Sequence, residues 1–589
     1  MADFLKKLAG LFVYKEPSNK ELGFELLENP GDTGYESEEP KEPQEQESKQ
    51  GISKEKRQRH YKRPLNADQW IEKKKADSSE TPAKPGSISK DLDSNIDKLK
   101  KLFNMPKNMD VVIREFNLGR KVKAFIVFME NMVDRNLLNS SLLPQLMDKD
   151  VFRQNVPECA VDYVVQNIIA ADSVTKASEY HEAVTAVLRG DTVLFIDGCP
   201  ECALIQTCGA EKRAITKPQT EPVVKGSHEA LTESLDTNVS LIRKIIKNEN
   251  LISEYLNVGN TNHSQVAVMY LKGVANRQIV NEVKKRINRI DTAYIAGTGF
   301  VEQFIEDNPY MLFPQVINTE RPDRAANFIM EGLVVIIADG TPSAIAVPCT
   351  FFRLMHTSED KNLRWPFATF LRLIRYIGLM SAIFLPGMYV ALTLFHIEVI
   401  PTELLVSITR AKELVPFPTL VEILIMEISF EMVREGAIRV PGVIGQTLGI
   451  VGALILGQAA VTANLVSPIL VIIVSLTAIG SFCIPNYELS LALRVARFVF
   501  IFAGACFGFY GISIMLSVVV ILACSMKSFG VPFFAPVAPK TKINHDTILR
   551  SPITSKKERT DALNTPDRQD QGDNVKNWTK KAPENEGGT

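Results

Sequence analysis

The residues of this chain best suited to chemistry are four carboxylates inside an otherwise apolar stretch. The segment 417–435 reads FPTLVEILIMEISFEMVRE and carries Glu422, Glu427, Glu431 and Glu435. A charged carboxylate at the centre of a bilayer costs about 2.5–3.5 kcal/mol even on lenient scales. Several such charges facing lipid would cancel most of the gain from inserting this helix. We therefore expect them to face protein, a membrane interface or a water-filled path.

Helical spacing groups three of the charges in this segment. Glu427 and Glu431 lie about 40° apart on a helix, because successive residues turn by about 100°. Arg434 falls close to the direction of Glu427 and is three residues from Glu431, so the three side chains are expected to form a local ionic cluster. Glu422 points to nearly the opposite side from Glu431. Three interpretations stay open: an ion cluster that holds helices together, a direct role in ion permeation or gating, and an interfacial surface.

The apolar segment that follows, 441–465, combines glycine with polar side chains. Its small residues allow neighbouring helices to approach closely, and Gln446, Thr447 and Gln458 add polar groups. Tight helix packing explains such a pattern, and so does a helix that lines a pore. Gln446, Thr447 and Gln458 are the candidate pore-lining residues.

The elements that must position these residues form a membrane domain at 366–530. Its apolar segments are 376–395, 441–465, 467–485 and 495–526. Because a crossing takes about 20 apolar residues, we expect four spans, with 401–435 as an amphipathic acidic segment that is interfacial or partly inserted. The last segment is long enough for one tilted span or for a span bent near Gly508–Gly511. Four spans and the flanking basic residues place both ends of the chain in the cytoplasm.

The rest of the chain is expected to be soluble. The fold class is multidomain, with two cytoplasmic α/β subdomains followed by an all-α polytopic membrane domain, and with disordered tails. The expected boundaries outside the membrane domain are a charged tail at 1–105, subdomains at 106–218 and 219–365, and a C-terminal cytoplasmic tail at 531–589.

The two subdomains carry similar hairpins. Asp197-Gly198 and Asp339-Gly340 each lie between two apolar runs, which is a hairpin signal. The preceding glycines, Gly190 and Gly332, stand at the same interval. A true internal duplication stays open, because β-hairpins share turn chemistry in general.

Several function classes find no support. The formal net charge of −1 shows no basic excess of the kind that binds nucleic acid. No Walker loop, GxGxxG after a strand, or HExxH motif occurs, so we expect no enzyme activity and no cofactor. Cys199, Cys202 and Cys208 lie close together, but no nearby fourth ligand completes a metal site.

Five motifs carry a resemblance to a known family. They are KGSHEALTESLDTNVSLIR (225–243), FPQVINTERPDRAANFIMEG (313–332), VVIIADGTPSAIAVP (334–348), VPFPTLVEILIMEISFEMVREGAIRVPGVIGQTLGIVGALILGQAAV (415–461) and SFGVPFFAPVAP (528–539). Over roughly 106–540 the chain resembles the A subunit of GerA-type spore germinant receptors. The departures are mild: Lys225-Gly226-Ser227 stands where the family usually has Arg-Gly-Pro, and Gly436-Ala437 is reversed.

The resemblance implies a protein of the spore inner membrane that acts with a transporter-like B subunit and a lipoprotein C subunit. It also implies a homo-oligomer, a pentamer, that forms a nutrient-gated channel and releases monovalent cations on germinant sensing. The alternatives are an accessory paralogue made during sporulation, which amplifies germination, and a solute transporter. The transporter is disfavoured because the chain lacks the paired hydrophobic halves that inverted repeats give.

Overall fold

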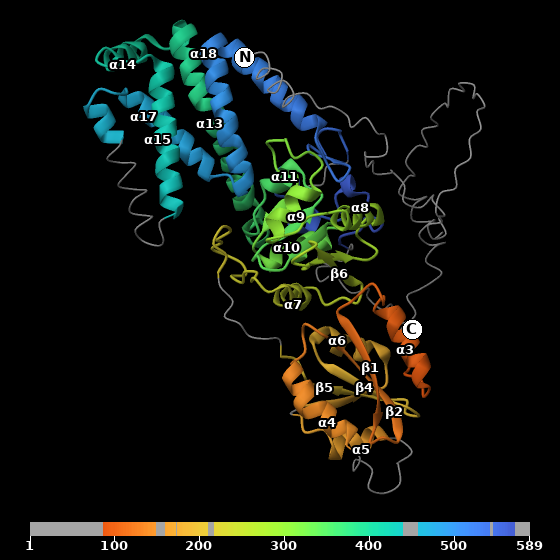
Figure 1. Ribbon diagram of the computed structural model, residues 1–589. Coiled ribbons are helices and arrows are strands. Elements are labelled where there is room, and N and C mark those ends of the chain that lie inside the picture. Colours follow the sequence, from red (N-terminus) through yellow and green to blue (C-terminus); the bar gives the residue numbers. More distant parts are fainter. Residues whose placement is uncertain are drawn as a thin grey trace, which may run out of the picture.

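The structure, a computed structural model, describes residues 86–148, 160–171, 173–209, 217–439, 457–541 and 546–571. Two β-sheet units and a group of helices follow one another along the molecule (Figure 1). The order in space therefore matches the order in sequence, with the second sheet unit between the first unit and the helices.

The first unit is a five-stranded antiparallel sheet with helices on both faces. Its strands are β1 Val111–Leu118, β2 Val122–Met129, β3 Val174–Ala177, β4 Thr192–Ile196 and β5 Cys202–Ile205, in the order β1-β2-β4-β5-β3. Its helices are α3 Leu92–Leu102, η1 Leu137–Leu142, α4 Leu143–Met147, α5 Ala160–Asn167 and α6 Tyr180–Arg189. Strand β2 is buried on both sides: Phe125 and Val127 pack with α3 and α6, whereas Ala124 and Ile126 pack with α4 and α5.

The second unit repeats this topology. Its strands are β6 Leu251–Val258, β7 Ser264–Leu271, β8 Ile317–Thr319, β9 Val334–Ala338 and β10 Ala344–Val347, in the order β6-β7-β9-β10-β8. Its helices are α7 Leu235–Ile245, α8 Arg277–Asn288, α9 Thr298–Ile305 and α10 Pro322–Met330. Both expected hairpins are present as β4–β5 and β9–β10. The likeness extends from these hairpins to whole sheets, which favours the duplication that the sequence left open.

A buried ion pair joins the two sheet units. Arg243 on α7 donates from Nε to Asp110 Oδ2 of the first unit over 2.6 Å, and Tyr255 on β6 donates to Asp110 Oδ1 over 2.6 Å. Both Arg243 and Asp110 are almost fully buried. Removing one partner would leave an uncompensated buried charge, so this pair fixes the contact between the units.

The first unit begins earlier than expected, because α3 lies within the stretch 1–105. The Asp91 side chain accepts a hydrogen bond from the Ser94 amide and caps the helix. Ile96 and Leu99 pack into the sheet core. The many charges of this region are on the outer face of α3 and hid its apolar stripe, so the expectation of a tail up to residue 105 is wrong for this helix.

Part of the expected C-terminal tail also folds back. Short strands β11 Lys527–Ser528 and β12 Val531–Pro532 pair, and turns η4 Ile553–Ser555 and η5 Asp561–Leu563 follow. Asn276 Nδ2 donates to the carbonyl oxygens of Leu563 and Asn564 over 3.3 Å each. The segment 546–571 is therefore docked on the second unit.

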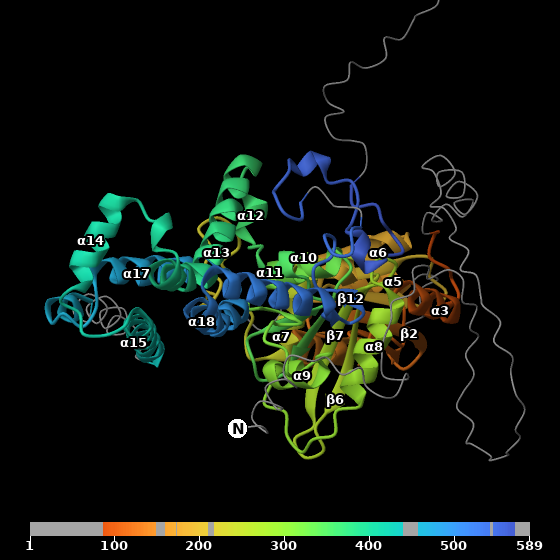
Figure 2. The same cartoon turned by 90° about the horizontal axis from the view of Figure 1, so that it is seen from above.

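The helical part contains the expected acidic segment and apolar helices. Its elements are α11 Phe351–Leu354, α12 Glu359–Asn362, α13 Trp365–Phe395, η3 Ile397–Val399, α14 Thr402–Lys412, α15 Thr419–Arg439, α17 Pro468–Phe482 and α18 Tyr487–Ser525. Seen from above, α14, α15 and α17 extend away from the sheets, whereas α11 stays beside the second unit (Figure 2). Within the described ranges, α13 and α18 are the two helices long and apolar enough to cross a membrane.

Glycines shape the contact between α13 and α18, which lie side by side (Figures 1 and 2). A Cβ on Gly504 would lie 2.6 Å from the Gly387 carbonyl oxygen, so the two backbones touch only because both residues lack a side chain. Gly508 has φ 59° and ψ −142° and interrupts α18. Of the two alternatives for this segment, one tilted span or a span bent near Gly508–Gly511, the structure therefore has the bend.

Of the four expected spans, 376–395 lies within α13 and 495–526 largely within α18. The segment 467–485 forms α17, whose 15 residues are fewer than the about 20 that a crossing takes. The segment 441–465 lies mostly outside the described residues.

Candidate functional site: an ion-pair network among three helices

Two arginines of α18 face the acidic residues of α15. Arg494 and Arg497 are three residues apart and therefore lie on one face of α18, as Glu427 and Glu431 do on α15. Arg497 Nη1 pairs with Glu427 Oε2. Arg494 Nη1 lies 3.0 Å from Glu431 Oε2, and Arg497 Nη2 lies 4.0 Å from Glu431 Oε1. The two helices are thus joined by a short ladder of ion pairs.

The Glu427–Arg497 pair is withdrawn from solvent. The exposed fraction is 0% for Glu427 and 1% for Arg497. An isolated charge in such a place would be very costly, so each partner is tolerable only because the other is there. The carboxyl of Glu431 is more open, with 26% of its side chain exposed.

Arg434 joins the third helix to the network. Its Nη1 lies 3.2 Å from Glu431 Oε1, and its Nη2 donates to Ser481 Oγ on α17 over 3.0 Å. The guanidinium also lies over the rings of Phe430 and Phe482, at 5.0 and 4.8 Å from their centroids. One side chain therefore holds α15 against α17 by charge, hydrogen bond and ring contact.

The network has more positive than negative groups. Three guanidiniums, those of Arg434, Arg494 and Arg497, meet the two carboxylates of Glu427 and Glu431. Among the described residues, Glu427 Oε1, Arg434 Nε and Arg497 Nε have no hydrogen-bond partner. The network consequently keeps unused donor and acceptor capacity, part of it on the fully buried Glu427 and Arg497.

Glu422 has a different structural role from the other acids of α15. Its Oε2 accepts a hydrogen bond from the Ser467 amide over 3.1 Å, just before α17 begins. The Ser467 side chain caps the same helix by accepting from the Leu470 amide over 3.4 Å. A carboxylate at a helix N-terminus is stabilised by the helix dipole, so Glu422 anchors the start of α17. This agrees with its expected direction, away from Glu431.

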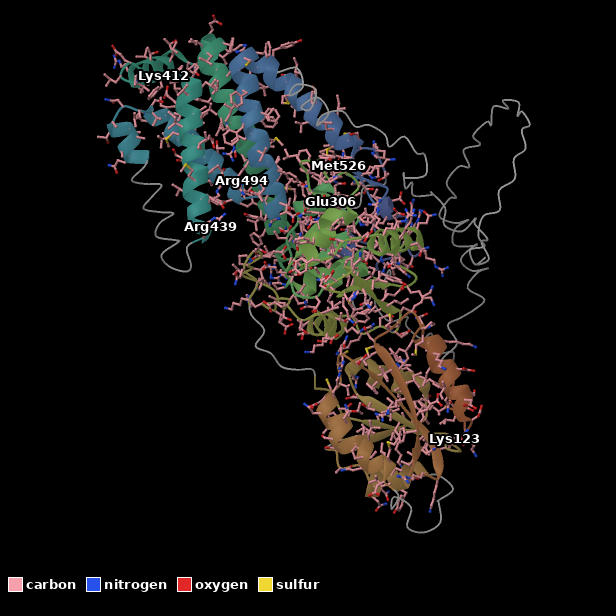
Figure 3. The ribbon with its side chains drawn as sticks, viewed as in Figure 1. Lys123, Glu306, Lys412, Arg439, Arg494 and Met526 are labelled. Carbon is pink, nitrogen blue, oxygen red and sulfur yellow. The ribbon has the colours of Figure 1, made fainter. Side chains whose placement is uncertain are left out.

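The remaining charges of α15 and the candidate pore-lining residues lie elsewhere. Glu435 and Arg439 form an exposed pair of 2.5 Å near the end of α15, where Figure 3 labels Arg439. Gln446 and Thr447 lie outside the described residues. Gln458 is exposed.

The sequence interpretation missed the arginines of α18. The expected cluster of Glu427, Glu431 and Arg434 is present in part: Arg434 pairs with Glu431, whereas the partner of Glu427 is Arg497 on another helix. The sequence signal was available, because Arg494 and Arg497 lie in a helix of 39 residues whose other charged residue is Glu488 in its first turn. Such charges require carboxylate partners, and α15 carries them.

The cysteines form no comparable site. Cys199 and Cys202 are buried and Cys208 is exposed. Burial raises the pKa of the Cys202 thiol to about 12, so it stays protonated and unreactive. Within the described parts of the chain, no three histidine, cysteine or acidic side chains gather as metal ligands.

Comparison with known proteins identifies the class. Residues 97–562 match the family described as Bacillus/Clostridium GerA spore germination protein. This span contains both sheet units and the ion-pair network. The chain belongs to the GerA family of spore germination proteins.

Sequence identity to individual relatives shows how similar the chain is to particular spore germination proteins. Spore germination protein KA of Bacillus subtilis (strain 168) is 37% identical over 493 residues, 83% of this chain and 90% of the relative. Spore germination protein A1 of the same organism is 34% identical over 466 residues, 79% and 95% of the two chains. The uncharacterized membrane protein YfkQ, also from B. subtilis, is 37% identical over 445 residues, 75% and 86%.

A solved structure is also similar to part of the chain. It is the crystal structure of the N-terminal domain of the A subunit of the Bacillus megaterium spore germinant receptor GerK3, with 29% identity and a TM-score of 0.36, covering 45% of this chain and 98% of that one. Within the GerA family, the chain is of the germinant-receptor A-subunit type.

Proposed function

We propose that this chain is the A subunit of a spore germinant receptor and forms its cation-conducting part. It would lie in the spore inner membrane as a homo-oligomer, a pentamer, with a transporter-like B subunit and a lipoprotein C subunit, and would release monovalent cations when a nutrient is sensed. The observation that carries the proposal is the buried ion-pair network between α15 and α18. Structural helices rarely hold this many charges among apolar neighbours without a functional reason.

The network would allow two conformational states, one with α15 packed against α18 and one with α15 moved away from it. With α15 against α18, the three guanidiniums outnumber the two carboxylates and the local charge repels cations. Moving α15 away would separate Glu427 from Arg497 and offer its carboxylate, with that of Glu431, to a passing cation. Binding of a nutrient to a partner subunit shifts the equilibrium between these two states only as far as the nutrient binds one state more tightly than the other. Because Glu431 is already partly exposed and Glu427 is not, Glu431 is the first acid of the network that a cation would meet.

Gene deletion in the spore-forming host tests the proposal. Spores that lack this chain should lose their response to one nutrient and keep their responses to others, and potassium release after that nutrient should disappear with it. Reintroducing the gene should restore both. A slower response to every nutrient would favour the accessory paralogue instead. Unchanged germination and unchanged potassium release with every nutrient tested would refute a role in germination.

A further inference from the structure

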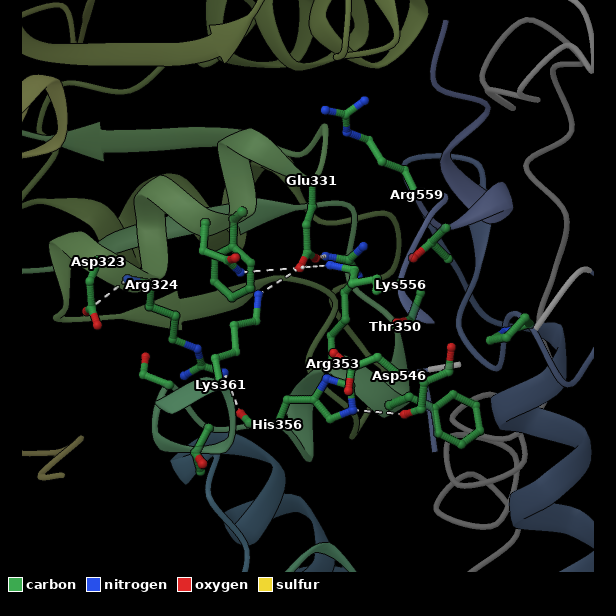
Figure 4. Close-up of a pocket in the computed structure, with 18 of the residues that line it drawn as sticks. Asp323, Arg324, Glu331, Thr350, Arg353, His356, Lys361, Asp546, Lys556 and Arg559 are labelled. Atoms are coloured by element: carbon green, nitrogen blue, oxygen red, sulfur yellow. Dashed lines mark hydrogen bonds and ion pairs between the residues drawn. The ribbon is translucent and has the colours of Figure 1, made fainter. Parts of the chain in front are cut away.

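A cavity of about 270 Å³ lies where three parts of the chain meet. Its walls come from α10 and the end of the second unit, from the segment 350–362 that leads into α13, and from the C-terminal part of the chain, at 535–536 and in the docked segment 546–571 (Figure 4). The ion-pair network of α15 is not part of it. The cavity therefore needs an explanation of its own.

Three cations converge on a single carboxylate in this cavity. Arg353 Nη1 lies 2.8 Å from Glu331 Oε2, Lys361 Nζ lies 2.8 Å from Glu331 Oε1, and Lys556 Nζ lies 3.5 Å from the same Oε1. Asn327 Nδ2 also donates to Oε1 over 3.3 Å. Figure 4 shows Arg353, Lys361 and Lys556 pointing toward Glu331. One carboxylate cannot neutralise three cations.

The excess of positive charge persists when the surroundings are included. The cavity is lined by five cations and three carboxylates; these are Arg324, Arg353, Lys361, Lys556 and Arg559, and Asp323, Glu331 and Asp546. Among the described residues, their further ion-pair partners are three cations and three carboxylates: Arg321, Arg372 and Arg550, and Glu221, Asp567 and Asp570. Asp360, which pairs with Arg372, and Arg375, which pairs with Asp360, add one charge of each sign. The excess of two positive charges is therefore unchanged.

Of the two ammonium groups in the cavity, that of Lys361 shows this surplus in its pKa. Burial, followed by the charge of Lys556, lowers the pKa of Lys361, although Glu331 opposes the shift. Burial would raise the pKa of Glu331, but Lys361, Arg353 and Lys556 together hold it well below its usual range. Burial and Arg372 lower the pKa of His356 to about 3, so its imidazole is neutral and adds no charge. Burial would lower the pKa of Lys556, but Glu331, Asp570 and Asp546 outweigh it and raise that pKa. The shortage of negative partners therefore falls on Lys361.

We propose that this cavity binds a phosphate group. A phosphate monoester carries about −1.5 to −2 charge at neutral pH, which matches the excess of two, and its oxygens suit a guanidinium fork and two ammonium groups. The bound group would join Arg353 and Lys361, which precede α13, to Lys556 of the C-terminal segment. Phosphate binding would therefore fasten the C-terminal segment to the head of an apolar helix.

Two sources can supply this chemistry. One is free phosphate or a small phosphorylated molecule. The other is a phospholipid headgroup, whose phosphodiester carries one negative charge and so offsets half of the excess. Trp365, Phe367 and Phe370 are exposed at the start of α13, a few residues after Lys361, and aromatic side chains favour the membrane interface. Both sources place a phosphate against the same three cations.

The test uses the purified full-length chain in detergent, with inorganic phosphate as the probe at constant ionic strength. Calorimetric titration should show saturable binding that sodium chloride does not reproduce. Lys556→Gln should weaken it about tenfold or more, because a charge-assisted contact is lost. Lys557→Gln is the matched control: it removes the same charge one residue away, at an exposed position outside the cavity lining, and should change binding less than twofold. Lys361→Gln is a second variant, and circular dichroism checks that each variant is folded.

A lipid arm separates the two sources. The thermal midpoint of the chain is compared in vesicles of phosphatidylglycerol and of phosphatidylcholine. A rise in phosphatidylglycerol that Lys556→Gln and Lys361→Gln abolish supports the site with a lipid as the source, and saturable inorganic phosphate binding that they weaken supports it with a soluble source. If neither phosphate nor phosphatidylglycerol shows an effect that depends on Lys556 or Lys361, the proposal is overturned.

Discussion

The Glu427–Arg497 pair should make a large and cooperative contribution to stability. Breaking a buried ion pair by removing one partner costs about 3–5 kcal/mol, because the other charge is left buried. Glu427→Gln keeps the shape and one acceptor oxygen, and Glu431 lies 4.0 Å from Arg497, so we expect the lower end, about 3 kcal/mol. Since folded proteins are stable by about 5–15 kcal/mol, this is a substantial fraction.

The matched control lies on the same helix. Glu435→Gln removes a carboxylate from an ion pair whose side chains are 62% and 76% exposed, and exposed pairs contribute about 0–1 kcal/mol. Equilibrium unfolding in detergent micelles, followed by circular dichroism, measures both variants. The reasoning fails if Glu427→Gln proves as stable as Glu435→Gln.

A double-mutant cycle isolates the interaction itself. Arg497→Met should also cost about 3 kcal/mol, because it strands Glu427. The double variant Glu427→Gln with Arg497→Met should be more stable than the sum of the single effects by about 1.5 kcal/mol or more, since neither charge is then left alone. Additive effects would show that the two side chains do not stabilise each other.

Three further predictions concern pH and backbone. Burial and Arg372 lower the pKa of His356 to about 3, so between about pH 6.5 and pH 3 the unfolded chain binds this proton and the folded chain does not. The free energy of unfolding should therefore fall with acidification by up to about 1.4 kcal/mol per pH unit. Urea titrations should show that His356→Gln removes this loss. Burial and neighbouring carboxylates raise the pKa of Glu302 to about 8, so the folded chain keeps a proton that the unfolded chain loses above about pH 4.5. The free energy of unfolding should therefore fall as the pH rises toward 8. Glu302→Gln should make the free energy of unfolding less dependent on pH in this range. Gly508→Ala should lower the free energy of unfolding by about 1–3 kcal/mol and with it the thermal midpoint, because φ is positive and the new Cβ would lie 2.7 Å from a His396 ring carbon. Gly299→Ala should leave the midpoint unchanged, since nothing lies within 4 Å of its new Cβ.

Each of these predictions has an outcome that contradicts it. Unchanged acid sensitivity in His356→Gln would show that the imidazole is protonated in the folded chain. An equal alkaline slope in Glu302→Gln would show that Glu302 ionises normally. Equal midpoints for Gly508→Ala and Gly299→Ala would show that the bend in α18 tolerates a side chain.

Local patterns in the sequence were sufficient for the two hairpins. The Asp-Gly turns at 197–198 and 339–340, each between two apolar runs, are short-range signals. Helix α3 was missed because its apolar stripe of Ile96 and Leu99 is thin within a charged segment. The docking of the C-terminal segment was missed for another reason. It depends on contacts with distant residues such as Asn276, which no local pattern records.

Only the part of the candidate site that lies on α15 was predictable from the sequence. The acids of α15 stand out because carboxylates are rare in apolar segments, and helical spacing brings Glu431 to Arg434. The pairing of Glu427 with Arg497 joins residues 70 positions apart, so spacing along one helix cannot reveal it. Counting charges across all apolar helices would have found it, since buried carboxylates and buried guanidiniums require one another.

The most direct test of the proposed function is potassium release from spores per molecule of this chain. Spores that carry the wild-type chain, Glu427→Gln or Glu435→Gln are exposed to the nutrient that this chain serves, and external potassium is followed by an ion-selective electrode while immunoblots measure the amount of the chain. Control of the cation path by the α15–α18 network predicts altered release per molecule for Glu427→Gln and wild-type release for Glu435→Gln. Equal release per molecule in all three would contradict it.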